Sequence, residues 1–325
     1  MAVSNASLVL INRIESGKAN LVGSIKKRLS TFCNKNKNVE LFEDTNTCLL
    51  TEQAEKDFFM SIFGEIDNIN SMRFYRYTSY RSFLRIFDSN EQSMCSVVGM
   101  NDTTERNYYA LYVKKKFSKQ IKSMDDHEMS NIFPSNNDFH YYITSLMPKK
   151  NYDNLDMWRI YGDDGKGVML EYEVNNHLLS SNFFLSNILY ETSKDSNGVI
   201  KFLFYLMLYD FGGGRHIQFH FWNVWQHMFK PYEYRNEKEI RLLYMSKDVD
   251  RWVLNEQYNI LMPIKLFSLY GVKCTKQEFP LKLKRILLGP KIMEKTTNKE
   301  MLKIALSNIG FNDVEVEYSS IYSYR

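Results

Sequence analysis

The feature that most constrains the fold is a strict alternation of side chains over residues 237–244, which follows a turn-prone aromatic segment, residues 230–236. Alternation with a period of two is typical of a β-strand, whose successive side chains point to opposite faces. It predicts that Glu237 and Glu239 share one face and stand close together. If that face lines a cleft, the pair suits general-base work or stabilisation of positive charge on a sugar carbon. The competing interpretation is a solvent-exposed strand end with Glu239 and Arg241 as a surface ion pair.

The composition indicates a globular protein. A chain of 325 residues can bury the core of one large domain, or of one domain with an appendage. The hydrophobic share of 44% and the aromatic share of 15% suit a chain rich in strands and large pockets. The net charge of +4 permits a polyanionic partner without requiring one.

The cysteines and apolar runs indicate a reducing, non-membrane setting. No two cysteines have the C-x-x-C spacing of a zinc ribbon, and they lie far apart, at Cys33, Cys48, Cys95 and Cys274. The apolar run near the N-terminus, residues 7–11, is too short for a secretory signal. The longest apolar run, residues 199–211, contains Lys201 and Asp210 and is too short to span a bilayer. We therefore expect a cytoplasmic protein without a membrane partner.

Residues 1–70 are predicted to form a helical N-terminal extension that packs on a main domain, residues 71–325. Apolar and basic positions follow helical spacing over residues 20–32. Thr51 is placed to cap a second helix. The expected buried stripe of that helix consists of Ala54, Phe58, Phe59, Ile62 and Phe63.

The main domain mixes strands and helices. Strands are predicted over residues 72–78, 93–98, 138–146, 168–174, 183–191, 281–288 and 314–318. Helices are predicted over residues 105–129 and 295–309, after residue 79 with Phe83, Leu84, Ile86 and Phe87 buried, and as an apolar pair in residues 199–229. Strands outnumber regular β-α-β units, which favours an α+β fold over a doubly wound parallel sheet.

Two local patterns resemble sites but are better explained by structure. Gly165-Lys166-Gly167 lacks the spacing of a phosphate loop and is predicted to be a hairpin turn, although the lysine could reach a phosphate. His216 and His220 are four residues apart on the second apolar helix, but aromatic residues surround them and no third ligand is evident. We therefore expect no metal. No G-x-S-x-G motif is present.

Three polar groups remain within apolar strands, where an unpaired charge or hydroxyl costs free energy. They are Arg76, the pair Thr144-Ser145, and the pair Glu237 and Glu239. The position of Arg76 among aromatic residues calls for an anionic partner, which is either an internal carboxylate or the phosphate or ribose of a ligand. Both alternatives are open at this point.

Several motifs resemble, in order, a bacterial domain family of unknown function, DUF2971, over about residues 72–325. They lie at residues 75–77, 100–102, 143–145, 157–168, 237–242 and 286–290. The more specific ones are M-W-x-x-Y-G with the following K-G-V, from Met157 to Val168, and I-L-L-G-P at the last position. Thr103 departs from the family, which usually has proline there, and this loosens the turn.

The order arginine, serine, Glu-x-Glu, each on a strand, is similar to the signature of ADP-ribosyltransferases. Tyr234-x-x-Glu237-x-Glu239 resembles the turn by which those enzymes present the acceptor. This resemblance implies an antiparallel-rich split β-sheet core of ADP-ribosyltransferase type with flanking helices. It also implies NAD as a substrate and no metal.

The resemblance implies a role for each matching residue. Arg76 would hold the phosphate or ribose of NAD, and Ser145, with Thr144 before it, would support the nicotinamide pocket. Glu239 would hydrogen-bond the ribose and stabilise the oxocarbenium-like transition state, while Glu237 would orient or deprotonate the acceptor. The candidates for stacking on the bases, and for a further phosphate contact, are Tyr75, Tyr77, Trp158, Tyr161 and Lys166.

The expected function is mono-ADP-ribosylation of a protein or nucleic-acid acceptor. The resemblance implies a bacterial toxin or phage-defence effector, for which an antitoxin or other regulatory partner is a natural companion. One alternative is NAD glycohydrolysis at the same site, with water as acceptor and Glu237 dispensable. The other alternative is a non-catalytic module that binds a nucleotide, a nucleic acid or a protein.

Overall fold

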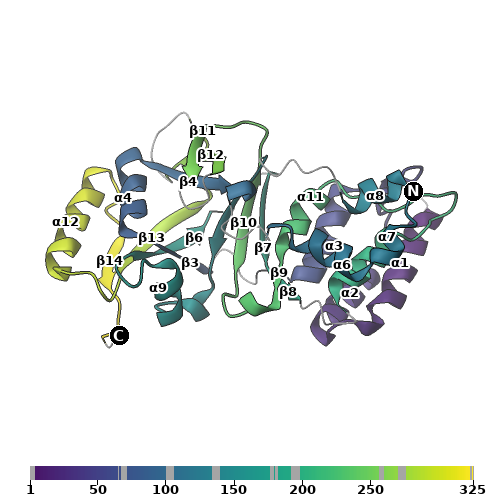
Figure 1. The fold of residues 1–325 in the computed structure, drawn as a ribbon, viewed down its shortest axis with the longest axis horizontal. Helices are drawn as coiled ribbons and strands as arrows, with labels where there is room; N and C mark the ends of the chain where they lie inside the picture. Colours follow the sequence, from purple (N-terminus) through teal and green to yellow (C-terminus); the bar gives the residue numbers. More distant parts are fainter. Residues whose placement is uncertain are drawn as a thin grey trace. The chain divides into compact units, whose positions relative to one another are not determined.

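The computed structural model describes residues 4–64, 66, 72–99, 106–133, 140–175, 179, 182–191, 198–255, 260–269, 276–322 and 324. It divides into two compact units whose segments alternate along the chain. The helical unit comprises residues 1–65, 100–137 and 186–235, and the sheet unit comprises residues 66–99, 138–185 and 236–325. Figure 1 labels many of the elements of both units. The helices predicted for residues 1–70 thus share their unit with two later segments.

The helical unit contains eight of the described α-helices and two short pairs of strands. The helices are α1 (Asn5–Gly17), α2 (Gly23–Asn36), α3 (Glu52–Phe63), α6 (Tyr108–Lys116), α7 (Ser118–Ile121), α8 (Asp126–Ile132), α10 (Val199–Met207) and α11 (Trp222–Trp225). The strands are β1 (Phe42–Asp44) with β2 (Leu49–Leu50), and β8 (Leu189–Glu191) with β9 (Phe229–Pro231). The helix predicted over residues 105–129 is therefore a series of three short helices.

The start of α3 confirms the predicted cap. The hydroxyl of Thr51 accepts a hydrogen bond from the backbone N–H of Ala54 at 3.1 Å. The whole predicted stripe of this helix is buried, and Phe58 and Phe59 are almost inaccessible to solvent. A polar cap followed by an apolar stripe is local information, which is why the sequence specified this helix correctly.

The second apolar helix predicted in residues 199–229 is wrong. The three glycines Gly212–Gly214 all have positive φ, and the carboxylate of Asp210 accepts hydrogen bonds from backbone N–H groups in this turn. Beyond it, Gln218 bridges to Leu49 as extended chain, and α11 begins only at Trp222. The histidines His216 and His220 therefore do not share a helix face. Tertiary pairing overrides the helical spacing of the aromatic residues here.

The sheet unit contains a six-stranded and a four-stranded sheet. The first has the order β11-β12-β4-β5-β10-β7 and the second the order β14-β13-β6-β3. The strands are β3 (Arg73–Thr78), β4 (Glu91–Ser96), β5 (Tyr141–Leu146), β6 (Val168–Val174), β7 (Phe183–Asn187), β10 (Ile240–Met245), β11 (Arg251–Asn255), β12 (Ile260–Ser268), β13 (Leu281–Leu288) and β14 (Glu315–Tyr318). Antiparallel pairing dominates, although β13 and β14 are parallel. The predicted α+β class with antiparallel-rich sheets is thus confirmed.

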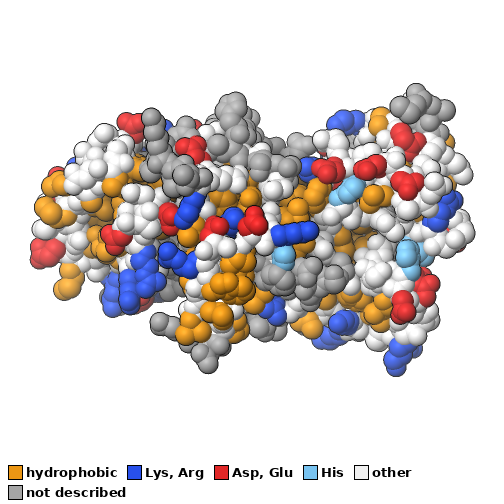
Figure 2. Space-filling view, turned by 90° about the horizontal axis from the view of Figure 1, so that it is seen from above, with side chains coloured by type: hydrophobic (Ala, Val, Ile, Leu, Met, Phe, Trp, Pro, Cys, Tyr) orange, Lys and Arg blue, Asp and Glu red, His pale blue; other side chains and the backbone are white. Residues whose placement is uncertain are grey.

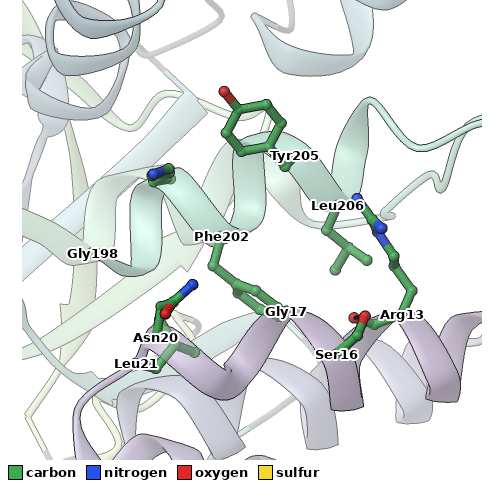
Figure 3. A pocket seen from close by; sticks show the side chains of 10 residues that line it. Arg13, Ser16, Gly17, Asn20, Leu21, Gly198, Phe202, Tyr205 and Leu206 are labelled. Atoms are coloured by element: carbon green, nitrogen blue, oxygen red, sulfur yellow. Dashed lines mark hydrogen bonds between the residues drawn. The ribbon is translucent and has the colours of Figure 1, made fainter. Parts of the chain in front are cut away.

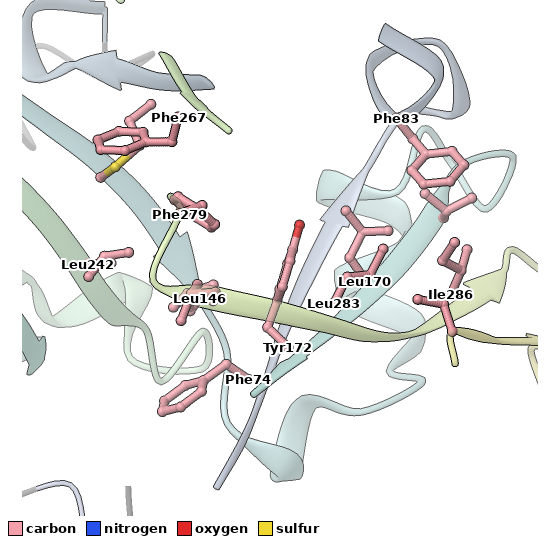
Figure 4. Packing of buried hydrophobic residues seen from close by; sticks show 14 of the residues in the cluster. Phe74, Phe83, Leu146, Leu170, Tyr172, Leu242, Phe267, Phe279, Leu283 and Ile286 are labelled. Carbon is pink, nitrogen blue, oxygen red and sulfur yellow. The ribbon is translucent and has the colours of Figure 1, made fainter. Parts of the chain in front are cut away.

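One backbone contact joins the two sheets. Tyr75 and Met147 exchange a pair of backbone hydrogen bonds of 2.9 and 2.8 Å, so β3 meets the end of β5. Apolar side chains from both sheets form one buried cluster, part of which Figure 4 shows. Phe74 and Leu146 belong to this inner cluster, whereas Tyr75 and Met147 belong to a second cluster on the other strand face. Alternation along β3 and β5 therefore assigns each residue to an inner or an outer face.

Three helices accompany these sheets: α4 (Tyr80–Ser89), α9 (Leu155–Tyr161) and α12 (Lys295–Asn308). On α4, Phe83 and Phe87 are buried as predicted, but Leu84 is 40% exposed, which corrects that expectation. Gly165-Lys166-Gly167 is not a hairpin turn, because it connects α9 to β6. A Cβ at Gly167 would lie 2.1 Å from the backbone oxygen of Thr78, so the close approach requires glycine.

Some predicted features lie outside the described residues, namely residues 100–102, Thr103 and Cys274. Among the residues that are described, none of the helices has the length and apolar character needed to cross a bilayer. On the described part of the face in Figure 2, acidic and basic side chains are interspersed, in keeping with the small net charge.

Candidate functional site

The structure brings Ser145 and Glu239 together. Ser145 on β5 pairs with Arg241 on β10, and Glu239 immediately precedes β10. The Ser145 hydroxyl donates a hydrogen bond of 2.6 Å to Oε1 of Glu239, across 94 positions of sequence. Ser145 is exposed and Glu239 is only 3% exposed, so the hydroxyl lies above a buried carboxylate.

Arg241 fixes that carboxylate from the other side. Its Nε donates to Oε1 of Glu239 at 2.9 Å, and its terminal Nη2 donates to Oε2 at 3.1 Å. Arg241 is 1% exposed, so the pair is buried, and the surface ion pair considered from the sequence is wrong. A bidentate pair of this kind holds the carboxylate in one orientation.

Glu237 does not continue the strand. Lys238 has φ of 49°, a left-handed conformation that breaks the extended backbone, and β10 begins only at Ile240. Glu237 and Glu239 are therefore not the neighbours on one regular strand that the sequence predicted. The Tyr161 hydroxyl, at the end of α9, donates to Oε1 of Glu237 at 2.5 Å. Tyr161 is 36% exposed and lies at the rim of the site.

Tyr77 and Trp158 are brought together as part of the core. Their rings meet edge to face with centroids 4.8 Å apart, and both are buried. The Tyr77 hydroxyl donates to the backbone oxygen of Asn151 at 2.6 Å and accepts from the backbone N–H of Asn154 at 2.9 Å. Burial raises the pKa of Tyr77. In this structure both rings anchor the start of α9 and are not open for stacking on a ligand.

Arg76 and Thr144 lie on the other strand face. Arg76 alternates with Tyr75 and Tyr77, and its charge partly offsets the burial that raises the pKa of Cys95. Nη1 of Arg76 and Oγ1 of Thr144 are buried without a hydrogen-bond partner among the described residues. No described carboxylate forms an ion pair with Arg76. The structure does not bring Arg76 to the Ser145–Glu239 pair.

A cavity of about 470 Å³ opens on the outer face of the four-stranded sheet. It is lined by Met72, Arg73, Tyr75, Lys149, Tyr152, Glu171 and Arg285. Tyr75 pairs with Met147, which follows Ser145 by two positions, so the cavity and the Ser145 hydroxyl share one strand face. Apart from Tyr75, sequence reasoning missed these residues. The signal that could have identified Arg73 is its position on β3, two residues before Tyr75 and therefore on the same strand face.

Charge pairing organises this cavity. The buried carboxylate of Glu171 lies 3.3 Å from Nε of Arg73 and 3.8 Å from a terminal nitrogen of Arg285. Lys149 is exposed and forms no ion pair with a described carboxylate. The rings of Tyr75 and Tyr152 meet edge to face at 5.3 Å. Burial, reinforced by Glu171, raises the pKa of Tyr75 to about 12. Arg73 also pairs with Glu173, so the cavity offers a ligand two phenol rings, the paired guanidinium groups of Arg73 and Arg285, and the ammonium group of Lys149.

The remaining predicted residues lie elsewhere. Lys166 is exposed in the loop before β6, where neighbouring Lys291 pairs with Asp164 at 2.7 Å. In the helical unit, His216 lies 3.8 Å from Glu128, and His220 lies 3.1 Å from Glu43. Within the part of the chain that the structure describes, no three His, Cys, Asp or Glu side chains are arranged to hold a metal ion.

Comparison with known proteins gives one similarity. Residues 157–242 match a family described as "Protein of unknown function (DUF2971)". The match includes the M-W-x-x-Y-G segment, Tyr161 and the Glu237–Arg241 segment, so the resemblance to DUF2971 is supported over this range, and its description names no activity. No curated protein and no solved structure matches the chain.

Proposed function

We propose that the sheet unit is an NAD-dependent mono-ADP-ribosyltransferase with a macromolecular acceptor, either a protein or a nucleic acid. The observation that carries the proposal is the 2.6 Å hydrogen bond from Ser145 to Glu239. A hydroxyl and a carboxylate that are distant in sequence meet on one strand face, as the resemblance to ADP-ribosyltransferases implies. The DUF2971 match over residues 157–242 includes the carboxylate.

The residue types suit cleavage of the nicotinamide–ribose bond. As the C–N bond breaks, its electron pair leaves with neutral nicotinamide, and positive charge develops on the ribose carbon. A carboxylate held in advance by Arg241 stabilises that charge without reorganisation. In the proposed complex, a ribose hydroxyl replaces Ser145 as the donor to Glu239. The acceptor then bonds to the ribose carbon, and Glu237 takes its proton.

The cavity beside Tyr75 supports binding of the remaining part of NAD. Arg73 and Lys149 are our candidates for contacts with the diphosphate, since they lie on the face of Ser145 and Arg76 does not. Tyr152 adds an aromatic surface at the same cavity. A volume of about 470 Å³ lies within the usual range of ligand pockets.

The test is incubation of the full chain with NAD labelled in the adenylate part, in bacterial cell extract, together with an assay of free nicotinamide. Glu239→Gln keeps the size of the side chain and removes its charge, and Ser145→Ala removes the hydroxyl alone. We expect labelling to fall by about a hundredfold or more in Glu239→Gln and about tenfold in Ser145→Ala. Glu300→Gln, an exposed glutamate on α12, is the matched control and should be unchanged.

The label identifies the acceptor. Label on protein or on nucleic acid supports the transferase and names the acceptor class. No consumption of NAD by the wild-type chain contradicts the proposal, as does turnover that Glu239→Gln and Ser145→Ala leave unchanged. Circular dichroism of each variant separates loss of activity from loss of fold.

NAD glycohydrolysis at the same site is the second candidate. It is favoured by one observation, namely that Glu237 lies outside the strand with its carboxylate hydrogen-bonded by Tyr161. Water would then be the acceptor, and Glu237→Gln would leave nicotinamide release unchanged while Glu239→Gln would abolish it. Free nicotinamide without labelled macromolecule identifies this reaction.

A further inference from the structure

A second cleft lies within the helical unit, between α10 and α1 with its short 3-10 extension, Lys18–Asn20. Its volume is about 350 Å³, within the range of small-ligand sites. It is lined by Arg13, Ser16, Gly17, Asn20, Leu21, Gly198, Lys201, Phe202, Tyr205 and Leu206. Figure 3 shows Arg13 extending from α1 toward α10, and Phe202 and Leu206 extending the opposite way.

Helical spacing on both sides builds this cleft. The lining residues recur at intervals of three and four on each helix, which places them on one face of α1 and one face of α10. Gly17 permits the close approach, because a Cβ there would lie 2.9 Å from the Phe202 ring. Phe202 thereby becomes part of an apolar floor with Leu21 and Leu206, all of them at most 8% exposed.

The walls carry positive charge. Arg13 and Lys201 line the cleft from opposite helices, and no acidic side chain is among its described lining residues. Arg13 lies over the ring of Tyr209 at 4.7 Å and forms no ion pair with a described carboxylate. Lys18, one turn further along the chain, differs, since it pairs with Glu15 at 2.5 Å. The guanidinium of Arg13 is therefore available to an anion that enters the cleft.

The backbone N–H groups at the start of α10 do not supply affinity for an anion in the cleft. The buried carboxylate of Glu191 accepts the N–H groups of Val199 and Ile200, so that helix end already has its anion. Recognition thus depends on the side chains: the guanidinium of Arg13, an apolar floor, and the hydroxyl and amide groups of Ser16, Asn20 and Tyr205.

We infer that this cleft binds a small organic anion, with a phosphate or carboxylate at Arg13 and an apolar body over Phe202 and Leu206. Charge-assisted hydrogen bonds hold the head, and burial of the body adds affinity. The inference is independent of the proposed function, which concerns the sheet unit. It is tested by ligand binding and not by turnover of NAD.

The test is isothermal titration calorimetry of the full chain with 1-naphthyl phosphate. We expect a dissociation constant of about 1 mM or tighter. Inorganic phosphate has the anionic head without the apolar body, and 1-naphthol has the apolar body without the anionic head. Both should bind at least about tenfold more weakly than 1-naphthyl phosphate. Comparison with 1-naphthoate shows whether a phosphate or a carboxylate head is preferred. No binding of either naphthyl anion, or equal binding of 1-naphthol, would overturn the inference.

Variants locate the binding. Arg13→Gln should weaken it about tenfold, in line with loss of one charge-assisted contact. Ser16→Trp should block it by filling the cleft while Arg13 stays in place. Lys27→Gln, an exposed lysine on α2, is the control and should bind within about twofold of wild type. Unchanged binding by Arg13→Gln and by Ser16→Trp would show that the ligand binds elsewhere.

Discussion

Each unit contains more than one buried glutamate, and two of these residues, one from each unit, are stabilised in different ways. Glu55 in the helical unit accepts three N–H groups, from the backbones of His220 and Phe221 and from the indole of Trp225, at 2.6, 2.9 and 3.0 Å. Glu239 in the sheet unit is held by a guanidinium and a hydroxyl. Both residues are at most 3% exposed.

The difference shows how neutral N–H donors and a charged guanidinium each stabilise a buried carboxylate. Burial raises the pKa of Glu55 to about 7, and the N–H donors offset only part of that rise. Glu55 therefore changes charge near neutral pH while it holds residues 220–225 against α3. Glu239 instead has a full positive charge as a partner, so the substitution that tests its stabilisation is removal of Arg241.

The largest expected effect comes from removing the partner of Glu239. Arg241→Met leaves a buried carboxylate without its cation and should lower the free energy of unfolding by about 3–5 kcal/mol. The measurement is urea denaturation followed by circular dichroism. The double variant Arg241→Met with Glu239→Leu removes both charges and should recover much of that loss. A single variant within about 0.5 kcal/mol of wild type would show that the pair is not a stability element.

The next effect concerns pH and Glu55. The folded-state pKa of about 7 exceeds the ordinary value of 4.5, so the folded state holds the proton more tightly. The contribution of Glu55 to the free energy of unfolding is complete below pH 4.5 and declines as the pH rises toward 7, by up to about 3 kcal/mol. Urea denaturation at several pH values measures it. Glu55→Gln should abolish this slope, and Glu52→Gln, at an exposed position on the same helix, should keep it.

The smallest effects compare one helix cap in each unit. Thr51 caps α3, and Ser79 caps α4 by accepting from the backbone N–H of Ser82 at 3.1 Å. Thr51→Ala and Ser79→Ala should each cost about 1 kcal/mol. Calorimetry then shows whether the two substitutions lower the temperature of the same melting transition or whether each lowers the temperature of a different transition. Two separate shifts would mean that the units unfold independently, and a common shift would mean that they unfold together.

Local signals in the sequence predicted much of the fold. The cap at Thr51, the strand at residues 168–174 and the strand at residues 281–288 were all correct, because each is encoded by neighbouring residues. The helix predicted across His216 and His220 was wrong, because pairing of Gln218 with Leu49 and the turn at Asp210 outweighed the spacing. Propensity is a weak prior wherever a distant partner supplies the hydrogen bonds.

The candidate site shows the same limit. The sequence singled out Ser145 and Glu239, and the structure places them in contact. It did not reveal the left-handed Lys238, which separates Glu237 from the strand, nor the face on which Arg76 lies. A side-chain period of two assigns faces only relative to a register, and the register depends on which strands pair.

By itself, the sequence determined the α+β class, the cap at Thr51, most strands and the polar residues that needed partners. Only the tertiary structure decided which partners they found: Arg241 for Glu239, Tyr161 for Glu237, and no described carboxylate for Arg76. The physical reason is that periodicity and capping act over a few residues, whereas a buried charge is satisfied by whichever group the packing brings to it.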